Sequence, residues 1–132
     1  MNGTIKGHLI GAYKQILILL FTLLLAPEVW ADKPLAPDAI AGVTTVTTEQ
    51  SIELILSNPD LVVIDARLKE EYLKGHIESA VHLVDSAVNS ERLAQVLASK
   101  NTPVLFYCNG PRCLRSSRAA QKALKHGYTN IY

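Results

Sequence analysis

Residues 61–65 read Leu-Val-Val-Ile-Asp, and this stretch decides the fold class. Its four apolar residues follow one another with no polar residue between them, which is typical of a strand that is covered on both faces. Strands of this kind belong to parallel sheets, because crossover helices cover both faces of such a sheet. Asp65 stands at the carboxyl end of the predicted strand, at the edge where parallel sheets bind their ligands.

Two more strands are predicted on the carboxyl side of this stretch, at residues 80–83 and 104–107. Helices are predicted between and after them, at about 69–73, from Ser90 onward and at 116–126. This alternation of strand and helix predicts an α/β fold, in which a mostly parallel central sheet is flanked by helices on both faces.

On the amino side of the deciding stretch, the β-branched residues 43–46 predict a short strand. Residues 47–50 then fit a capping box that opens a helix. We expect this helix to turn Ile52, Ile55 and Leu56 toward the core, because these residues recur at helical spacing.

Residues 1–31 predict a secretory signal peptide. Two lysines precede an uncharged apolar run, 16–26, that is too short to span a bilayer comfortably. Val29 and Ala31 then offer the small residues that a signal peptidase reads. We therefore expect cleavage after Ala31 and a periplasmic or secreted domain with no stable membrane anchor. An uncleaved segment that anchors the protein in the membrane is the alternative.

The rest of the chain predicts one small domain. Residues 32–42 lack an apolar period and predict an extended leader, and residues 43–132 predict the domain itself. The opening of a strand predicted at Ile131 leaves open whether the domain continues beyond Tyr132.

Composition agrees with a small globular chain and excludes one class of partner. The 132 residues are 48% hydrophobic and 19% charged. Residues 1–31 hold two of the 13 basic residues and one of the 12 acidic ones, so 11 of each remain in the rest of the chain. In residues 32–132, the only cluster of basic residues is the short span 112–118. We therefore expect no nucleic-acid partner.

Cys108 directly follows the predicted strand 104–107 and precedes a loop with Gly110, Arg112 and Arg115. Backbone N–H groups in such a loop and at the start of a helix carry partial positive charge, and the arginines add full charges. These surroundings predict a thiol pKa below the usual value of about 8.5, and hence a reactive thiolate. The alternative is a small cysteine that packs at the end of a buried strand.

With these residues in view, the chain resembles the rhodanese sulfurtransferases. The resemblance rests on five motifs in the expected order, which are Val63–Arg67, Glu71–Tyr72, Gly75–Ile77, Ala80 and Val104–Ser116. It implies a rhodanese-like domain that moves sulfane sulfur from a small thiosulfate-like anion to a thiol or cyanide acceptor, with no cofactor and no metal. His76 lies in a turn motif of that family, so we interpret it as structural.

The resemblance also assigns roles to individual residues. Cys108 would be the catalytic nucleophile that carries the sulfur as a persulfide. The substrate would be bound by Gly110, Arg112, Arg115 and Ser116. A supporting polar network would contain Asp65 and Arg67, for which a purely structural ion pair is the alternative.

Two departures from the family pattern leave the function open. Six residues separate Cys108 from Arg115, where the usual loop has four, and related phosphatase loops have five. Cys113 adds a second thiol, which could discharge a persulfide on Cys108, form a redox couple with it, or staple the loop as a static disulfide. We expect Cys108 to take up the sulfur and Cys113 to discharge it. The alternative function is a non-catalytic binding module or a thiol–disulfide redox module that uses both cysteines.

Overall fold

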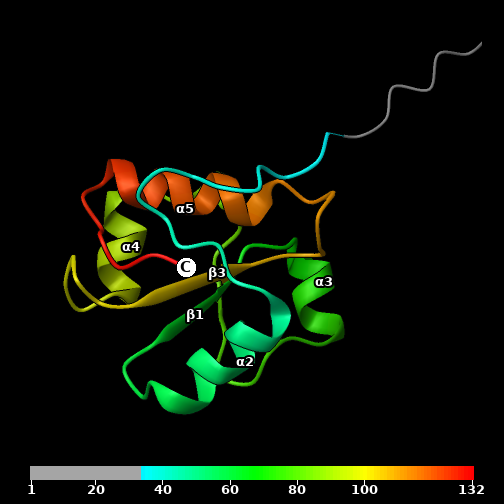
Figure 1. Ribbon diagram of the computed structural model, residues 1–132, viewed down its shortest axis with the longest axis horizontal. Coiled ribbons are helices and arrows are strands. Elements are labelled where there is room, and N and C mark those ends of the chain that lie inside the picture. The colour runs from blue at the N-terminus through cyan, green and yellow to red at the C-terminus, as the bar shows by residue number, and fades with distance from the viewer. Residues whose placement is uncertain (1–33) are drawn as a thin grey trace, which may run out of the picture. The chain divides into compact units, whose positions relative to one another are not determined.

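The computed structural model describes residues 34–132 (Figure 1), so the predicted signal peptide lies outside the described residues. Helices and strands alternate along them in the predicted way. Their order is α2 (Thr48–Ser57), β1 (Val62–Asp65), α3 (Lys69–Lys74), β2 (Val81–His82), the 3₁₀ turn η1 (Asp85–Ala87), α4 (Ser90–Val96), β3 (Val104–Tyr107) and α5 (Arg115–Lys125). Within this part of the chain, no helix is both long enough and apolar enough to cross a membrane.

The three strands form a parallel sheet in the order β2-β1-β3. Asp65, the last residue of β1, pairs with Tyr107, the last residue of β3. Ile131 makes a single parallel bridge to Val104, and the Tyr132 N–H donates to the Val104 carbonyl over 2.8 Å. The sheet edge at Asp65 and Tyr107 is therefore the carboxyl edge, and Cys108 follows it directly.

Apolar side chains cover both faces of the sheet, as the unbroken apolar stretch of β1 predicts. Because side chains alternate along a strand, Ile64 and Phe106 lie on one face while Val63 and Leu105 lie on the other. The first face packs against α4 and α5, and the second against Ile55 of α2 (Figure 1). The predicted α/β fold is confirmed.

Two predictions on the amino side of β1 were wrong in part. Residues 43–46 make no strand: Val43 forms an isolated antiparallel bridge with Ile40, and the segment runs extended beside the sheet. The capping box at the start of α2 is present, but Ile52 is 53% exposed and Leu56 81% exposed. The core on this face of the sheet consists of Val63, Ala80 and Leu105, and it is small. It therefore contacts only the side of α2 that carries Ile55.

Smaller differences concern where elements begin. The side chain of Asn89, and not that of Ser90, caps α4 by accepting from the Arg92 N–H over 2.9 Å. The described part of the leader, residues 34–42, forms neither helix nor strand, and its Ala36 N–H donates to the Pro111 carbonyl of the cysteine loop over 2.7 Å. The leader is thereby part of the surroundings of the two cysteines.

Candidate functional site

Cys108 leaves the end of β3 and lies against the first turn of α5. Its thiol donates a hydrogen bond to the Cys113 carbonyl, with 3.0 Å between sulfur and oxygen. Its sulfur lies 3.3 Å from the hydroxyl oxygen of Ser116. The structure thus brings together three of the predicted site residues, and both cysteine thiols are free.

The environment of Cys108 favours the protonated thiol. Burial raises its pKa above the ordinary thiol value, and the hydrogen bond with the Cys113 thiol raises it further. The Ser116 hydroxyl and N–H act in the opposite direction but do not prevail. The predicted lowering of this pKa is therefore wrong for the structure described here, because burial and the hydrogen bond with Cys113 outweigh the N–H and hydroxyl of Ser116.

Cys113 is the more acidic of the two thiols. Burial opposes its ionisation, but the hydrogen bond from Cys108, the backbone N–H groups of Asn109 and Arg115 and the charge of Arg115 outweigh burial and lower its pKa. A turn at Gly110, whose φ is +108°, places Cys113 there: the Cys113 N–H donates to the Gly110 carbonyl over 2.9 Å. Loop N–H groups were predicted to surround the Cys108 sulfur, but those of Asn109 and Arg115 stabilise the thiolate of Cys113.

A cavity of about 440 Å³ opens at Cys108, and we call it the apolar cavity. It is lined by the leader, residues 43–51, the end of β3, the cysteine loop and the start of α5. Gly110 and Ser116 line it, as predicted for substrate-binding residues. Among its described lining residues, Asp38 is the one charged side chain.

A second cavity of about 600 Å³ shares Cys113 with the first, and we call it the arginine cavity. Its described lining residues are Pro34, Glu71, Asn109, Arg112, Cys113, Leu114, Arg115 and Arg118. Arg112 and Arg115, predicted to bind substrate beside Cys108, line this cavity and not the apolar one. Cys113 lines both cavities.

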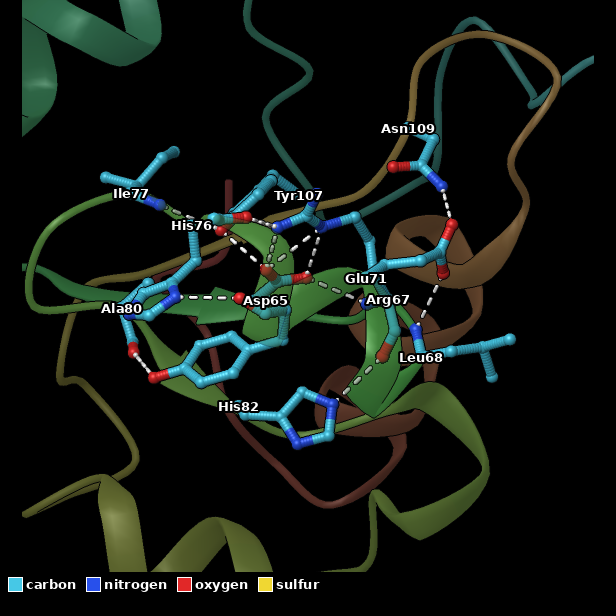
Figure 2. Close-up of polar contacts among 12 residues, drawn as sticks. Asp65, Arg67, Leu68, Glu71, His76, Ile77, Ala80, His82, Tyr107 and Asn109 are labelled. Atoms are coloured by element: carbon cyan, nitrogen blue, oxygen red, sulfur yellow. Dashed lines mark hydrogen bonds and ion pairs between the residues drawn. The ribbon is translucent and has the colours of Figure 1, made fainter.

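Glu71 of α3 holds the loop at both ends, a role that we did not predict. It accepts from Nη1 of Arg115 over 3.0 Å. Its other oxygen accepts from the side-chain amide of Asn109, as Figure 2 shows. The backbone N–H of Leu68 fixes the same carboxylate over 2.9 Å. These bonds, that of Leu68 first, lower the pKa of Glu71. Its place in the Glu-Tyr motif was the available signal in the sequence.

Asp65 and Arg67 form the supporting network predicted for them. Asp65 is fully buried, and its carboxylate accepts from the Arg67 guanidinium at 2.6 Å and from the Tyr107 hydroxyl at 2.7 Å (Figure 2). Burial opposes ionisation of Asp65, but these hydrogen bonds outweigh it and lower its pKa. Arg67 also donates to the Gly75 carbonyl over 2.7 Å. The network ties β1 to the turn after α3 and to the residue before Cys108, and its geometry is that of a structural ion pair.

The histidines near this network are bound to the scaffold. The His76 ring stacks on Tyr72 with 3.7 Å between ring centroids, and its Nδ1 lies 2.9 Å from the Tyr72 carbonyl. Nε2 of His82 lies 3.0 Å from the Arg67 carbonyl oxygen. The interpretation of His76 as structural agrees with these contacts.

The sequence profile of the rhodanese-like domain matches residues 48–132, from the start of α2 to the strand segment beside β3. This chain belongs to the rhodanese-like domain family. The structure of the BH2092 protein from Bacillus halodurans is similar to the domain, with a TM-score of 0.56 and 26% identity, over 67% of this chain and 63% of that one. The family and the fold predicted from the motifs are confirmed.

Curated relatives of this rhodanese-like domain carry different names. YibN of Escherichia coli is 26% identical over 93% of this chain and 81% of its own length. The thiosulfate sulfurtransferase PspE of Escherichia coli is 34% identical over 52% of this chain and 62% of its own length. The tRNA uridine(34) hydroxylase of Photorhabdus laumondii is 28% identical over 63% of this chain. The chain spans only about a quarter, 24%, of the length of that hydroxylase.

Proposed function

We propose that this rhodanese-like domain is a sulfurtransferase in which Cys108 carries sulfane sulfur as a persulfide. The observation that carries the proposal is the position of Cys108, which follows the carboxyl end of β3, faces a cavity and lies 3.3 Å from the hydroxyl of Ser116 in the first turn of α5. Similarity to the thiosulfate sulfurtransferase PspE supports the same reaction class. The donor is a thiosulfate-like anion, and the acceptor is a thiol or cyanide.

The reaction balances as transfer of one sulfur atom between nucleophiles. With thiosulfate as the donor, the bond between its two sulfur atoms breaks and sulfite leaves with the electron pair. The outer sulfur of thiosulfate becomes bonded to the sulfur of Cys108. The acceptor then attacks the outer sulfur of the persulfide, and Cys108 leaves as a thiolate. The Ser116 hydroxyl and N–H stabilise that thiolate as it forms.

Transfer of sulfur from thiosulfate to a thiol acceptor tests this proposal. The reduced parent chain is expected to form the acceptor persulfide, and Cys108→Ser is expected to form none. Ser86→Ala, at an exposed position that lines neither cavity, is the matched control for a change in a small polar residue. A Cys108→Ser variant as active as the parent would contradict the proposal, and so would a parent that transfers sulfur from no donor.

A second candidate function is a thiol–disulfide redox module, favoured by the contact between Cys108 and Cys113. In that function the two thiols would be oxidised to a disulfide by a partner and reduced again, with no persulfide formed. Counting free thiols before and after thiosulfate treatment separates the two functions. A persulfide retains a labile sulfur that cyanide releases as thiocyanate, whereas a disulfide releases none.

We also propose that the domain is exported, with Asp32 as its first residue after cleavage. The proposal is supported by the lysines, the apolar run and the small residues of segment 1–31. N-terminal sequencing of the protein from its native cells tests it. Met1 found intact on membrane-bound protein would support the anchored alternative instead.

A further inference from the structure

The thiol pair lies where two cavities meet whose linings differ in charge. Cys108 lines the apolar cavity, whereas Cys113 lines that cavity and the arginine cavity as well. The two thiols share a hydrogen bond, and the Cys108 sulfur also lies 3.0 Å from the Cys113 carbonyl oxygen. Cys113 could therefore accept a sulfur atom from a donor in the arginine cavity and transfer it to Cys108 in the apolar cavity.

The apolar cavity is a poor site for a small dianion. No Lys or Arg stands among its described lining residues, and its one charged side chain, Asp38, is acidic. An anion that enters such a cavity loses part of its hydration without gaining a cationic partner, which is unfavourable. An uncharged thiol fits the same lining of apolar side chains and hydroxyl groups.

The arginine cavity has the opposite preference. Three arginines and a single acidic residue, Glu71, are among its described lining residues. Glu71 holds the Arg115 guanidinium beside the loop at 3.0 Å, and Arg118 lies 3.8 Å from Asp85 of η1. The thiol that lines this cavity is the more acidic one, because the hydrogen bond from Cys108 and the backbone N–H groups of Asn109 and Arg115 lower its pKa.

We propose that Cys113 takes sulfur from anionic donors in the arginine cavity and passes it to Cys108, which delivers it to an uncharged thiol in the apolar cavity. This relay rests on the proposed sulfurtransferase function and names the route within it. The Cys113 thiolate attacks the outer sulfur of thiosulfate, the S–S bond of thiosulfate breaks, and sulfite leaves with the electron pair. Cys108 then attacks the outer sulfur of the Cys113 persulfide, Cys113 leaves, and the proton of the Cys108 thiol moves to Cys113.

Single-cysteine variants of the full chain test the order of loading. Each reduced variant is mixed with thiosulfate, and intact-protein mass spectrometry with peptide mapping follows the gain of one sulfur atom over time. Cys108→Ser is expected to gain the sulfur on Cys113, whereas Cys113→Ser is expected to load Cys108 at least tenfold more slowly than the parent loads. As a control, the uncharged reagent iodoacetamide must still alkylate Cys108 in the Cys113→Ser variant, because this shows that the Cys108 thiol remains accessible. The variant Cys113→Ala provides a second measurement of the loading rate.

The charge of the arginine cavity is tested on the same reaction. Arg118→Gln is expected to slow loading by thiosulfate by roughly threefold or more, because it removes a cation beside the entering dianion. Lys125→Gln removes one charge from the far end of the same helix and is expected to leave the rate unchanged. Loading of Cys113→Ser at the rate of the parent, or no uptake by Cys108→Ser, would overturn the relay and leave the proposed function standing. A parent that takes up no sulfur from any donor would overturn both.

Discussion

Glu71 and Arg115 form an ion pair of 3.0 Å between residues that are 44 positions apart in the sequence. Glu71 belongs to α3, and Arg115 is the first residue of α5, directly after the cysteine loop. The same carboxylate accepts from Asn109, the residue after Cys108. One side chain therefore fixes both ends of the segment that carries the two thiols.

Replacing Glu71 is expected to loosen this loop while leaving the fold intact. Glu71→Ala removes both side-chain bonds to the loop, so we expect faster amide hydrogen exchange at residues 109–114 and sulfur loading that is several times slower. Glu70→Ala, at an exposed neighbouring position of the same helix, is the matched control. Hydrogen exchange followed by mass spectrometry measures the first effect. Equal exchange in the two variants would show that Glu71 does not hold the loop.

Asp65 is expected to matter for stability more than for chemistry. Asp65→Asn breaks a buried ion pair and leaves the Arg67 charge uncompensated, which costs about 3 kcal/mol of unfolding free energy. Tyr107→Phe removes a single hydrogen bond to the same carboxylate and should cost only about 1–2 kcal/mol. Urea unfolding of the three proteins measures both values. A smaller loss for Asp65→Asn than for Tyr107→Phe would contradict this ranking.

The sign of the pH dependence at Asp65 follows from the direction of its pKa. The folded-state pKa is lowered, so ionised Asp65 stabilises the fold above its unfolded pKa of about 3.9, and this contribution disappears as pH falls through the lower folded value. The stability difference between the parent and Asp65→Asn should therefore be constant from neutral pH down to about pH 5 and shrink at lower pH. A difference that grows on acidification would exclude this linkage.

The sequence predicts the strands well because burial on both faces leaves unbroken apolar runs, as at residues 61–64. It predicts Cys108 at the sheet edge for the same reason. It cannot show which sulfur the loop amides face, because that depends on the turn at Gly110 and on the two extra residues of the loop. The exposure of Leu56 was also hidden, because periodicity marks an apolar helix face but not how far the core extends.

The pair formed by Glu71 and Arg115 illustrates a second limit. Each residue stands in a motif, but nothing in the spacing of the motifs says that α3 and α5 bring these charges together. The leader is a similar case, since its contact with Pro111 depends on the folded position of the cysteine loop. Long-range polar contacts of this kind require the three-dimensional arrangement of the elements.

The two thiols of the parent are expected to respond differently to pH. Alkylation requires the thiolate, so Cys113, whose pKa is lowered, should react with iodoacetamide at a lower pH than Cys108, whose pKa burial raises. Peptide mapping after brief alkylation between pH 6 and pH 10 gives the two profiles in one protein. Cys108→Ala should shift the Cys113 profile toward higher pH, because it removes a hydrogen bond that lowers the Cys113 pKa. Coincident profiles in the parent would contradict the assignment.

The character of the two cavities can be measured apart from thiol acidity. Iodoacetate and iodoacetamide both react with the thiolate, so the ratio of their rates at one cysteine does not depend on the fraction ionised, and it reports the local preference for an anion over an uncharged reagent. We expect this ratio to be roughly tenfold higher for Cys113, which faces the arginine cavity, than for Cys108, which faces the apolar cavity and Asp38.

The measurement uses Cys108→Ser and Cys113→Ser, so that each protein presents one thiol, and a small uncharged thiol in solution gives the reference ratio. Added salt should lower the ratio at Cys113, because screening weakens the attraction of the arginines for the anionic reagent. At Cys108 the ratio should stay below the reference, because an anion that enters the apolar cavity is desolvated near Asp38. If the ratios at the two cysteines are equal and unaffected by salt, the two cavities do not select by charge, and the sulfur relay loses its physical basis.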